Sequence, residues 1–128
     1  MSEPRLTLRA LPQLFAVARL PAGAPLPRWA TGSPWFSVTR TGEELSIVCK
    51  ADAVPANVRC EKAFRALMVE GPLDFALTGI LASLSKSMSD AKISLFAIST
   101  FDTDYILVRQ ASLAKAVRAL RSAGHTVG

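Results

Sequence analysis

A chain of 128 residues, half of them hydrophobic and a fifth charged, suits one compact domain or two very small units that share a core. No apolar run approaches the roughly 20 residues that a membrane-spanning helix requires. The N-terminal residues also lack the continuous apolar stretch of a signal peptide. The composition excludes a disordered chain and a membrane protein, and we expect a cytoplasmic location.

The first half of the chain alternates β-favouring runs with turn-forming residues. Residues 21–34 contain four of the eight prolines, so this stretch can hold at most one helical turn, and Trp29 is expected to pack that turn down. Residues 41–44 read as a hairpin loop around Gly42. Strands are predicted at 14–20, 35–40, 45–49 and 63–69, with a possible edge strand at 6–8.

The second half has clearer periodicity. Residues 78–89 place Ile80, Leu81, Leu84 and Met88 on one helical face, with Thr78 or Asp74 as the N-cap. A second helix is predicted from Ser112, and Gly124 ends it. The run 93–99 is apolar on both faces, which predicts a central strand covered on both sides. Further strands are predicted at 105–109 and 126–127.

The order of elements in the second half is strand, helix, strand, strand, helix, strand, which is the split βαβ, ferredoxin-like pattern. The first half repeats the strands with its helices shortened or missing. We therefore predict an α+β fold of two tandem ferredoxin-like (βαββαβ) units, at residues 1–62 and 63–128. The sheet should be antiparallel with helices on one face, and the first unit should have reduced helices.

Signals for catalysis and for cofactors are weak. His125 is the single histidine and reads as a structural or surface residue. No glycine-rich phosphate-binding loop is present. Cys49 and Cys60 are too few for a disulfide framework or a structural zinc site, and we expect reduced thiols. We expect no enzyme activity and no cofactor.

Two polar loops are candidates for ligand binding. Asp102 and Asp104 are two residues apart, so both could face one site; a plain hairpin turn, a ligand site on that turn and a divalent cation site all stay open. The loop 70–75 leads into the helix start near Thr78, where free N–H groups suit a carboxylate. Asp74 could cap that helix, or could hold an ammonium together with Asp104. A zwitterionic amino acid would fit such a pair of loops.

The C-terminal end of the chain is basic, since no acid follows Asp104 whereas four basic residues do. Lys115, Arg118 and Arg121 recur at three-residue spacing on the predicted helix, which is typical of a solvated face. No aromatic residues interleave with them for base stacking. We therefore expect no nucleic-acid partner.

The segment GPLDFALTGILASLSKSMSDAKISLFAISTFDTDYILV, residues 71–108, resembles an ACT domain, the βαββαβ regulatory module. Its STFDTDYILV run is the most specific part, and TRTGEELSIVC at 39–49 resembles the matching hairpin of a first ACT unit. The resemblance is to small tandem-ACT proteins related to the aspartokinase regulatory region and to CASTOR-type arginine sensors.

The resemblance implies a non-catalytic regulatory protein that binds an amino acid at an interface between ACT units. It also implies a homodimer and a regulated partner protein, which is unidentified. A ligand-free dimerisation or interaction module is the alternative. Carried over by position, the implied ligand contacts are Asp74, Phe75, Thr78, Gly79, Ile80, Ile93, Ser94, Ser99, Thr100, Phe101 and Asp104.

Overall fold

The computed structural model describes residues 5–71, 73 and 78–128. The chain divides into two compact units, a smaller one of residues 13–64 and a larger one of residues 1–12 with 65–128. Residues 5–12 therefore belong with the C-terminal half of the chain, whereas the predicted division kept all of 1–62 together.

The elements of the smaller unit are β2 (Phe15–Leu20), η1 (Arg28–Ala30), β3 (Ser37–Arg40), β4 (Leu45–Lys50), η2 (Ala51–Ala53) and the first part of β5 (Cys60–Val69). The strands form an antiparallel sheet in the order β3-β4-β2-β5. The helical segments among the described residues of this unit are the short 3-10 turns η1 and η2, as expected for a unit with reduced helices.

The core of the smaller unit lies between its sheet and its loops. Buried members include Ile47 and Cys49 of β4 and Ala30 of η1, with Trp29 packed against them as predicted. The Arg40 guanidinium donates hydrogen bonds to the main-chain carbonyls of residues 22 and 24, which fixes the proline-rich loop. Thr41 closes the predicted hairpin loop because its hydroxyl accepts from two main-chain N–H groups that follow it.

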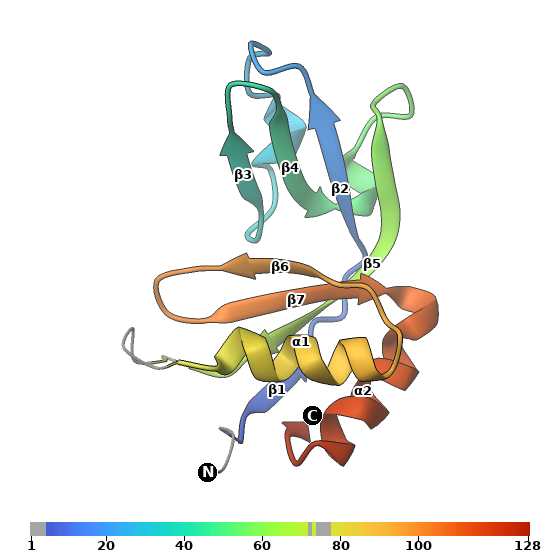
Figure 1. Ribbon diagram of the computed structural model, residues 1–128. Coiled ribbons are helices and arrows are strands. Elements are labelled where there is room, and N and C mark those ends of the chain that lie inside the picture. The colour runs from blue at the N-terminus through green and yellow to red at the C-terminus, as the bar shows by residue number, and fades with distance from the viewer. Residues whose placement is uncertain (1–4, 72, 74–77) are drawn as a thin grey trace. The chain divides into compact units, whose positions relative to one another are not determined.

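The elements of the larger unit, besides the second part of β5, are β1 (Thr7–Ala10), α1 (Ile80–Asp90), β6 (Phe96–Ser99), β7 (Asp104–Arg109), η3 (Gln110–Ser112), α2 (Leu113–Ser122) and β8 (Thr126–Val127). The strands form a sheet in the order β6-β7-β5-β1-β8. β1 runs antiparallel to β5 and parallel to β8, so the predicted antiparallel sheet includes one parallel pair. Two helices complete the βαββαβ order, and Figure 1 shows them side by side.

Both helices bury an apolar stripe against one face of this sheet. Leu84 and Met88 of α1, and Leu120 of α2, are fully buried because residues three and four apart share a helical face. They pack with alternate strand residues such as Val69 and Val108, which point to the same side of the sheet. The predicted α+β ferredoxin-like fold is confirmed, with helices on one face.

Two strand positions differ from prediction. β1 is paired on both sides, by β5 and β8, and is not an edge strand. Conversely, among the described strands β6 pairs only with β7, so it is an edge strand and not a central one. Phe96 and Ala97 of β6 are accordingly exposed. Apolar residues on both faces of the run 93–99 suggested burial, but the pattern does not show which strands or helices cover a segment.

The helix ends also follow local chemistry. The N-cap of α1 is Gly79, whose φ of 82° is left-handed, and not Thr78; Asp74, the other predicted cap, lies outside the described residues. Ser112 stands at the N-cap of α2 as predicted, although its side chain makes no capping hydrogen bond, and Gly124 with φ of 98° follows the end of the helix. After α1, Lys92 adopts φ of 59°, a conformation that glycine adopts without strain.

Candidate functional site

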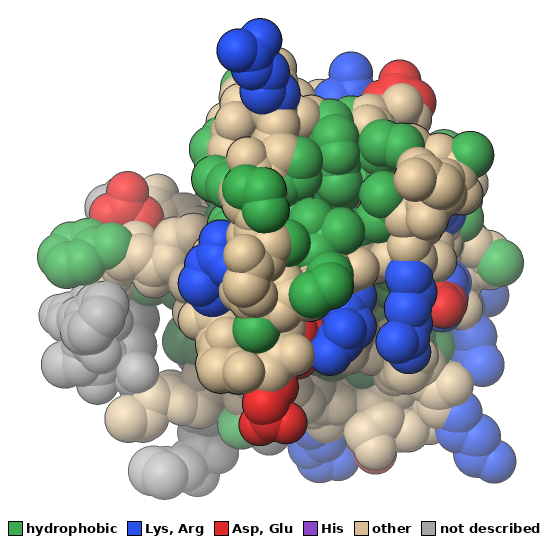
Figure 2. Space-filling view, turned by 90° about the horizontal axis from the view of Figure 1, so that it is seen from above, with side chains coloured by type: hydrophobic (Ala, Val, Ile, Leu, Met, Phe, Trp, Pro, Cys, Tyr) green, Lys and Arg blue, Asp and Glu red, His purple; other side chains and the backbone are tan. Residues whose placement is uncertain are grey.

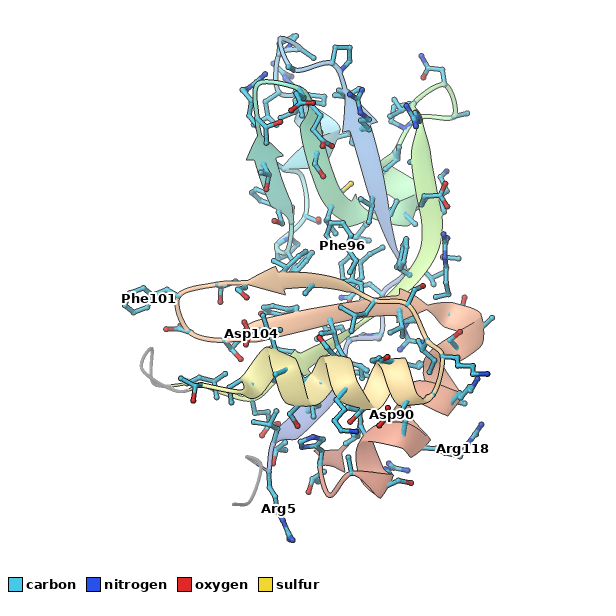
Figure 3. All side chains as sticks on the ribbon, viewed as in Figure 1. Arg5, Asp90, Phe96, Phe101, Asp104 and Arg118 are labelled. Atoms are coloured by element: carbon cyan, nitrogen blue, oxygen red, sulfur yellow. The ribbon has the colours of Figure 1, made fainter. Side chains whose placement is uncertain are left out.

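The larger unit holds a pocket of about 340 Å³ between the start of α1 and the turn that joins β6 to β7. These two segments are separated by almost twenty positions in the sequence, and the fold brings them together. Figure 3 shows the turn at the outer end of the β6–β7 hairpin, with Phe101 projecting from it. The described lining residues are Leu73, Gly79, Ile80, Leu81, Ala82 and residues 99–104.

The turn has a fixed shape. Ser99 pairs with Asp104 at the end of the ladder, and the chain reverses over the four residues between them. The Thr100 N–H donates to the Thr103 carbonyl at 2.8 Å, and the Thr100 hydroxyl accepts from the Thr103 N–H at 3.2 Å. These bonds hold the side chains at the tip in place relative to the two strands.

A second set of contacts attaches the turn to the loop before α1. The Leu73 N–H donates to the Asp102 carbonyl at 2.7 Å, and the buried Thr103 hydroxyl donates to the Val69 carbonyl. Gly71 permits this approach, since a Cβ there would lie 3.0 Å from the Asp102 carbonyl oxygen. These bonds attach the 99–104 turn, which forms one wall of the pocket, to β5 and to the residues that follow β5.

The start of α1 supplies hydrogen-bond donors. The Ser83 N–H donates to the Gly79 carbonyl at 2.9 Å, which is the first bond of the helix. The N–H groups of Ile80, Leu81 and Ala82 therefore have no acceptor within the helix, and all three residues line the pocket. Together with the helix dipole they favour an anionic group at this wall.

The opposite wall is acidic. Asp104 is half-buried, and its carboxylate accepts a hydrogen bond from the Ser99 hydroxyl at 2.6 Å. Asp102 is exposed on the same turn. No lysine, arginine or histidine lies among the described residues that line the pocket. The pocket thus offers hydrogen-bond donors on one side and carboxylates on the other.

Apolar side chains complete the lining. Leu73 and Leu81 are half-buried, and Ile80 is buried below them. Phe101 is 81% exposed at the tip of the turn, a high value for an aromatic side chain. An exposed aromatic ring at the rim of a pocket is typical of a binding surface and not of a core.

Some of the predicted ligand contacts line the pocket. Gly79, Ile80, Ser99, Thr100, Phe101 and Asp104 all line it. Thr78 is exposed just before Gly79, and the predicted contacts Asp74 and Phe75 lie outside the described residues. Ile93 is buried in the core of the larger unit and Ser94 is exposed; neither lines the pocket within the described part of one chain.

Five lining residues were absent from the predicted ligand contacts, namely Leu73, Leu81, Ala82, Asp102 and Thr103. For Asp102 the sequence leaves a plain hairpin turn, a ligand site and a cation site open. Its place in the pocket follows from main-chain contacts near Gly71, which leave no pattern in the sequence. Leu81 and Ala82 follow directly from the helix start and could have been inferred from Gly79.

His125 lies in a buried polar cluster away from the pocket lining. The Leu6 N–H donates to His125 Nδ1 at 3.1 Å, so in the neutral ring Nε2 carries the proton and faces Ser83 Oγ at 3.2 Å. A serine nucleophile requires the opposite tautomer, with an unprotonated nitrogen facing its hydroxyl. The arrangement fits the structural role predicted for His125.

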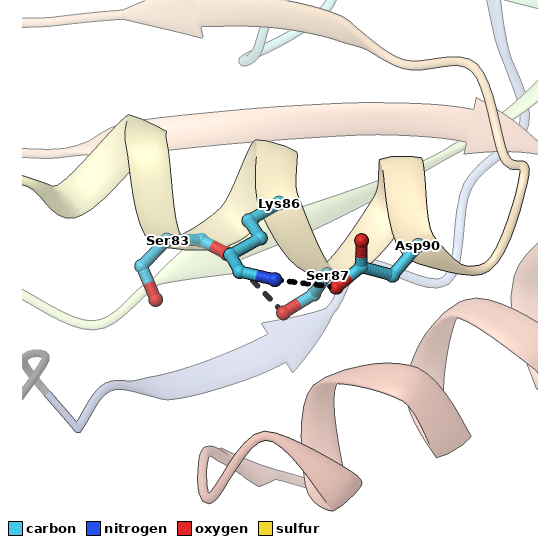
Figure 4. A network of polar contacts seen from close by, with 4 residues as sticks. All are labelled: Ser83, Lys86, Ser87 and Asp90. Carbon is cyan, nitrogen blue, oxygen red and sulfur yellow. Dashed lines mark hydrogen bonds and ion pairs between the residues drawn. The ribbon is translucent and has the colours of Figure 1, made fainter.

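Further polar groups of α1, exposed and buried, are shown in Figure 4. Lys86 and Asp90 form an exposed ion pair at 2.8 Å, one helical turn apart. The Ser87 hydroxyl donates to the Ser83 carbonyl at 3.2 Å. Exposed pairs of this type contribute little to stability, about 0.3–0.5 kcal/mol, so Asp90 is a suitable control position for the acidic residues of the pocket.

The two cysteines of the smaller unit are free thiols, as predicted. Burial raises the pKa of Cys49, and the nearby Cys60 and Asp52 raise it further. Cys49 is therefore protonated and unreactive at neutral pH. Among the described residues, no cluster of three or more metal-binding side chains occurs, and no helix is long and apolar enough to cross a membrane.

Hydrophobic and charged side chains are unevenly distributed on the surface. In the view of Figure 2, hydrophobic side chains gather in the middle and Lys and Arg side chains lie around them. Exposed large hydrophobic residues occur in both units, including Leu26 and Phe36 in the smaller unit and Phe96 in the larger one. Scattered residues of this kind are common on protein surfaces.

Two models of known protein families match the chain. A family model of the ACT domain matches residues 59–122, which is half of the chain. A second family model, of an N-terminal domain, matches residues 13–57. The boundary between the matched segments falls within a few residues of the boundary between the two structural units. No curated protein matches the chain.

Several solved structures are similar to the chain. A protein from Agobacterium tumefaciens is 40% identical, with a TM-score of 0.92, and the match covers 98% of this chain and 93% of that one. A Vibrio cholerae protein described as a possible transport protein is 18% identical, with a TM-score of 0.76 and coverage of 92% and 89%. The ligand-free regulatory subunit of aspartate kinase from Thermus thermophilus is 12% identical, with a TM-score of 0.61 and coverage of 91% and 96%. The last two likenesses show a shared fold.

Proposed function

This chain belongs to the ACT domain family, whose members are regulatory, and we propose that it binds an amino acid and acts through a partner protein. The observation that carries the proposal is the pocket formed by the start of α1 and the 99–104 turn. We further propose that the protein works in the cytoplasm, where reducing conditions keep thiols such as Cys49 and Cys60 free.

A free amino acid matches the two walls of this pocket. Its carboxylate can accept hydrogen bonds from the N–H groups at the start of α1, at residues 80–82. Its ammonium can donate to the carboxylate of Asp104 and to the Ser99 hydroxyl, which already share a hydrogen bond of 2.6 Å. Residues Leu73, Leu81 and Phe101 supply apolar surface for the ligand's side chain.

We also propose that the protein is a homodimer formed through β6. This strand pairs only with β7 among the described strands, so its outer edge presents unpaired main-chain groups. Its sequence, Phe-Ala-Ile-Ser, carries no charge and no proline that would oppose pairing with another strand.

Antiparallel pairing of β6 with a second copy would also account for two predicted ligand contacts. If the axis passes between Ala97 and Ile98, the residues before β6 in one copy come next to the 99–101 segment of the other copy. Ile93 and Ser94 would then approach the partner's pocket, although they do not line the pocket of their own chain. The proposed ligand site would lie at an interface between ACT units.

The test is a thermal-shift screen of the standard amino acids at millimolar concentration. A ligand that binds only the folded state raises the melting temperature, and the rise grows with the logarithm of the ligand concentration relative to its Kd. Asp104→Asn should abolish the shift without changing the melting temperature of the unliganded protein by more than a few degrees. Asp90→Asn, on the outer side of α1, is the matched control and should retain the shift.

The alternative function is a dimerisation module without a ligand, and the open edge of β6 is the observation that favours it. It predicts a stable dimer by light scattering together with no thermal shift from any amino acid. That combination would contradict the proposed ligand site and leave the proposed dimer intact.

A further inference from the structure

The described residues that line the pocket carry more negative than positive charge. Its anion-binding feature is the start of α1, which carries a partial positive charge of about one half. Its cation-binding features are two full carboxylates, Asp102 and Asp104. No basic side chain compensates them among the described lining residues. The pocket can therefore accommodate one anionic group of a ligand, but it offers no partner to a second one.

The proposed contacts to the ligand's carboxylate and ammonium do not use Asp102. The helix start receives the ligand's carboxylate, and Asp104 with Ser99 receives its ammonium. Asp102 lies two residues from Asp104, exposed and next to Phe101 at the rim, where a ligand's side chain would leave the pocket. A side-chain carboxylate at this place would meet two negative charges and no positive one.

We propose that Asp102 is a specificity-determining residue that makes the pocket reject amino acids with a side-chain carboxylate and accept neutral and cationic ones. This inference rests on the proposed amino-acid site. The physical basis is Coulomb repulsion at a partly desolvated rim, where one charge at about 5 Å changes affinity by roughly tenfold. A neutral side chain avoids the repulsion, and the Phe101 ring can cover its apolar part.

The position of Asp102 does not depend on its carboxylate. Its main-chain carbonyl accepts the 2.7 Å bond from Leu73, and the turn is closed by Thr100 and Thr103. Asp102→Asn should therefore keep the shape of the turn while removing one negative charge. The substitution therefore tests the charge of Asp102 without changing the shape of the turn.

The experiment is calorimetric titration with pairs of amino acids that have nearly the same shape and differ in charge, glutamine with glutamate and asparagine with aspartate. The wild-type protein should bind the amide of a pair at least tenfold more tightly than the acid. Asp102→Asn should reduce this ratio several-fold, and Asp102→Lys should bring it to one or below. Asp90→Asn is the control and should leave the ratio unchanged.

Each outcome has a separate meaning. Acids that bind wild-type protein as tightly as their amides would overturn the charge selection while leaving the amino-acid site standing. A wild-type preference that persists undiminished in a folded Asp102→Asn variant would overturn the role of Asp102. Failure of all amino acids to bind, in the screen and in the titrations, would overturn the proposed function and this inference with it.

Discussion

Lys92 occupies the position after a helix where glycine is most often found. Its φ of 59° belongs to the left-handed region, which brings the Cβ of an L-residue close to its own carbonyl oxygen. The following N–H, of Ile93, donates to the Met88 carbonyl at 2.8 Å, so the end of α1 requires this conformation.

Lys92→Gly should therefore stabilise the protein by about 0.5–1 kcal/mol, because relief of strain exceeds the added entropy of the unfolded chain. The measurement is urea denaturation at equilibrium. Lys92→Ala, which keeps the Cβ, should leave the free energy of unfolding nearly unchanged. A glycine variant that is no more stable than the alanine variant would contradict the strain argument.

Gly71 lies under the turn that forms one wall of the pocket. An added Cβ would lie 3.0 Å from the Asp102 carbonyl oxygen and 3.1 Å from the Leu73 nitrogen, both main-chain atoms that cannot move independently. Gly71→Ala should push the turn away, costing about 1–2 kcal/mol of stability and weakening the thermal shift by the ligand. Gly23→Ala is the control, since its Cβ would meet nothing within 4 Å. Equal behaviour of the two variants would show that the close approach at Gly71 is unimportant.

At the scale of elements, the helices were the most predictable part of the fold. The spacing of Leu84 and Met88, and of Ala116 and Leu120, reports directly which helical face is buried. Gly124 marks the end of α2 through its positive φ. These signals are local, so a single sequence contains them in full.

The pairing of strands was less predictable because it depends on partners far away in the chain. The sequence predicted β1 only as a possible edge strand, yet this strand lies between β5 and β8. β6 was predicted to be central, although it is paired on one side. For the pocket, Asp104 could be inferred from its acidic pair and Gly79 from the family resemblance, whereas the place of Leu73 and Asp102 depends on a loop-to-turn contact that no periodicity encodes.

The exposed edge of β6 leads to a prediction about assembly. Ala97→Lys places a charge in the middle of the open strand, a device that natural edge strands use against pairing. The variant should be monomeric by light scattering, with a melting temperature and circular dichroism spectrum like those of a folded protein. Ala114→Lys on the exposed side of α2 is the control and should remain dimeric. A dimeric Ala97→Lys variant would move the proposed interface away from β6.

At the scale of the whole molecule, β5 connects the two units covalently and through its ladders. Its first part pairs with β2 in the smaller unit, and its second part pairs with β1 in the larger one. Each part of β5 is hydrogen-bonded within its own unit, and the two parts are consecutive in one uninterrupted strand, so fraying that starts in one unit can spread along the strand into the other. We expect a single cooperative unfolding transition.

The two units have separate spectroscopic probes. Both tryptophans, Trp29 and Trp35, lie in the smaller unit, and both α-helices lie in the larger one. Ile47→Ala, in the core of the smaller unit, should cost about 2–4 kcal/mol and lower the midpoints of fluorescence and far-ultraviolet circular dichroism together. Leu84→Ala, in the core of the larger unit, should do the same. Separate midpoints for the two probes would show that the units unfold independently.

The place of β1 has a consequence for synthesis of the chain. Thr7 and Leu8 pair with Thr126 and Val127, so β1 must wait for a partner that is synthesised after every other described strand. Pairing over such a separation forms slowly, because the entropy of closing a long loop is lost before any contact compensates it. The smaller unit, whose residues are contiguous, can be complete while β8 has still to be synthesised. The larger unit can be complete only after β8 has emerged from the ribosome.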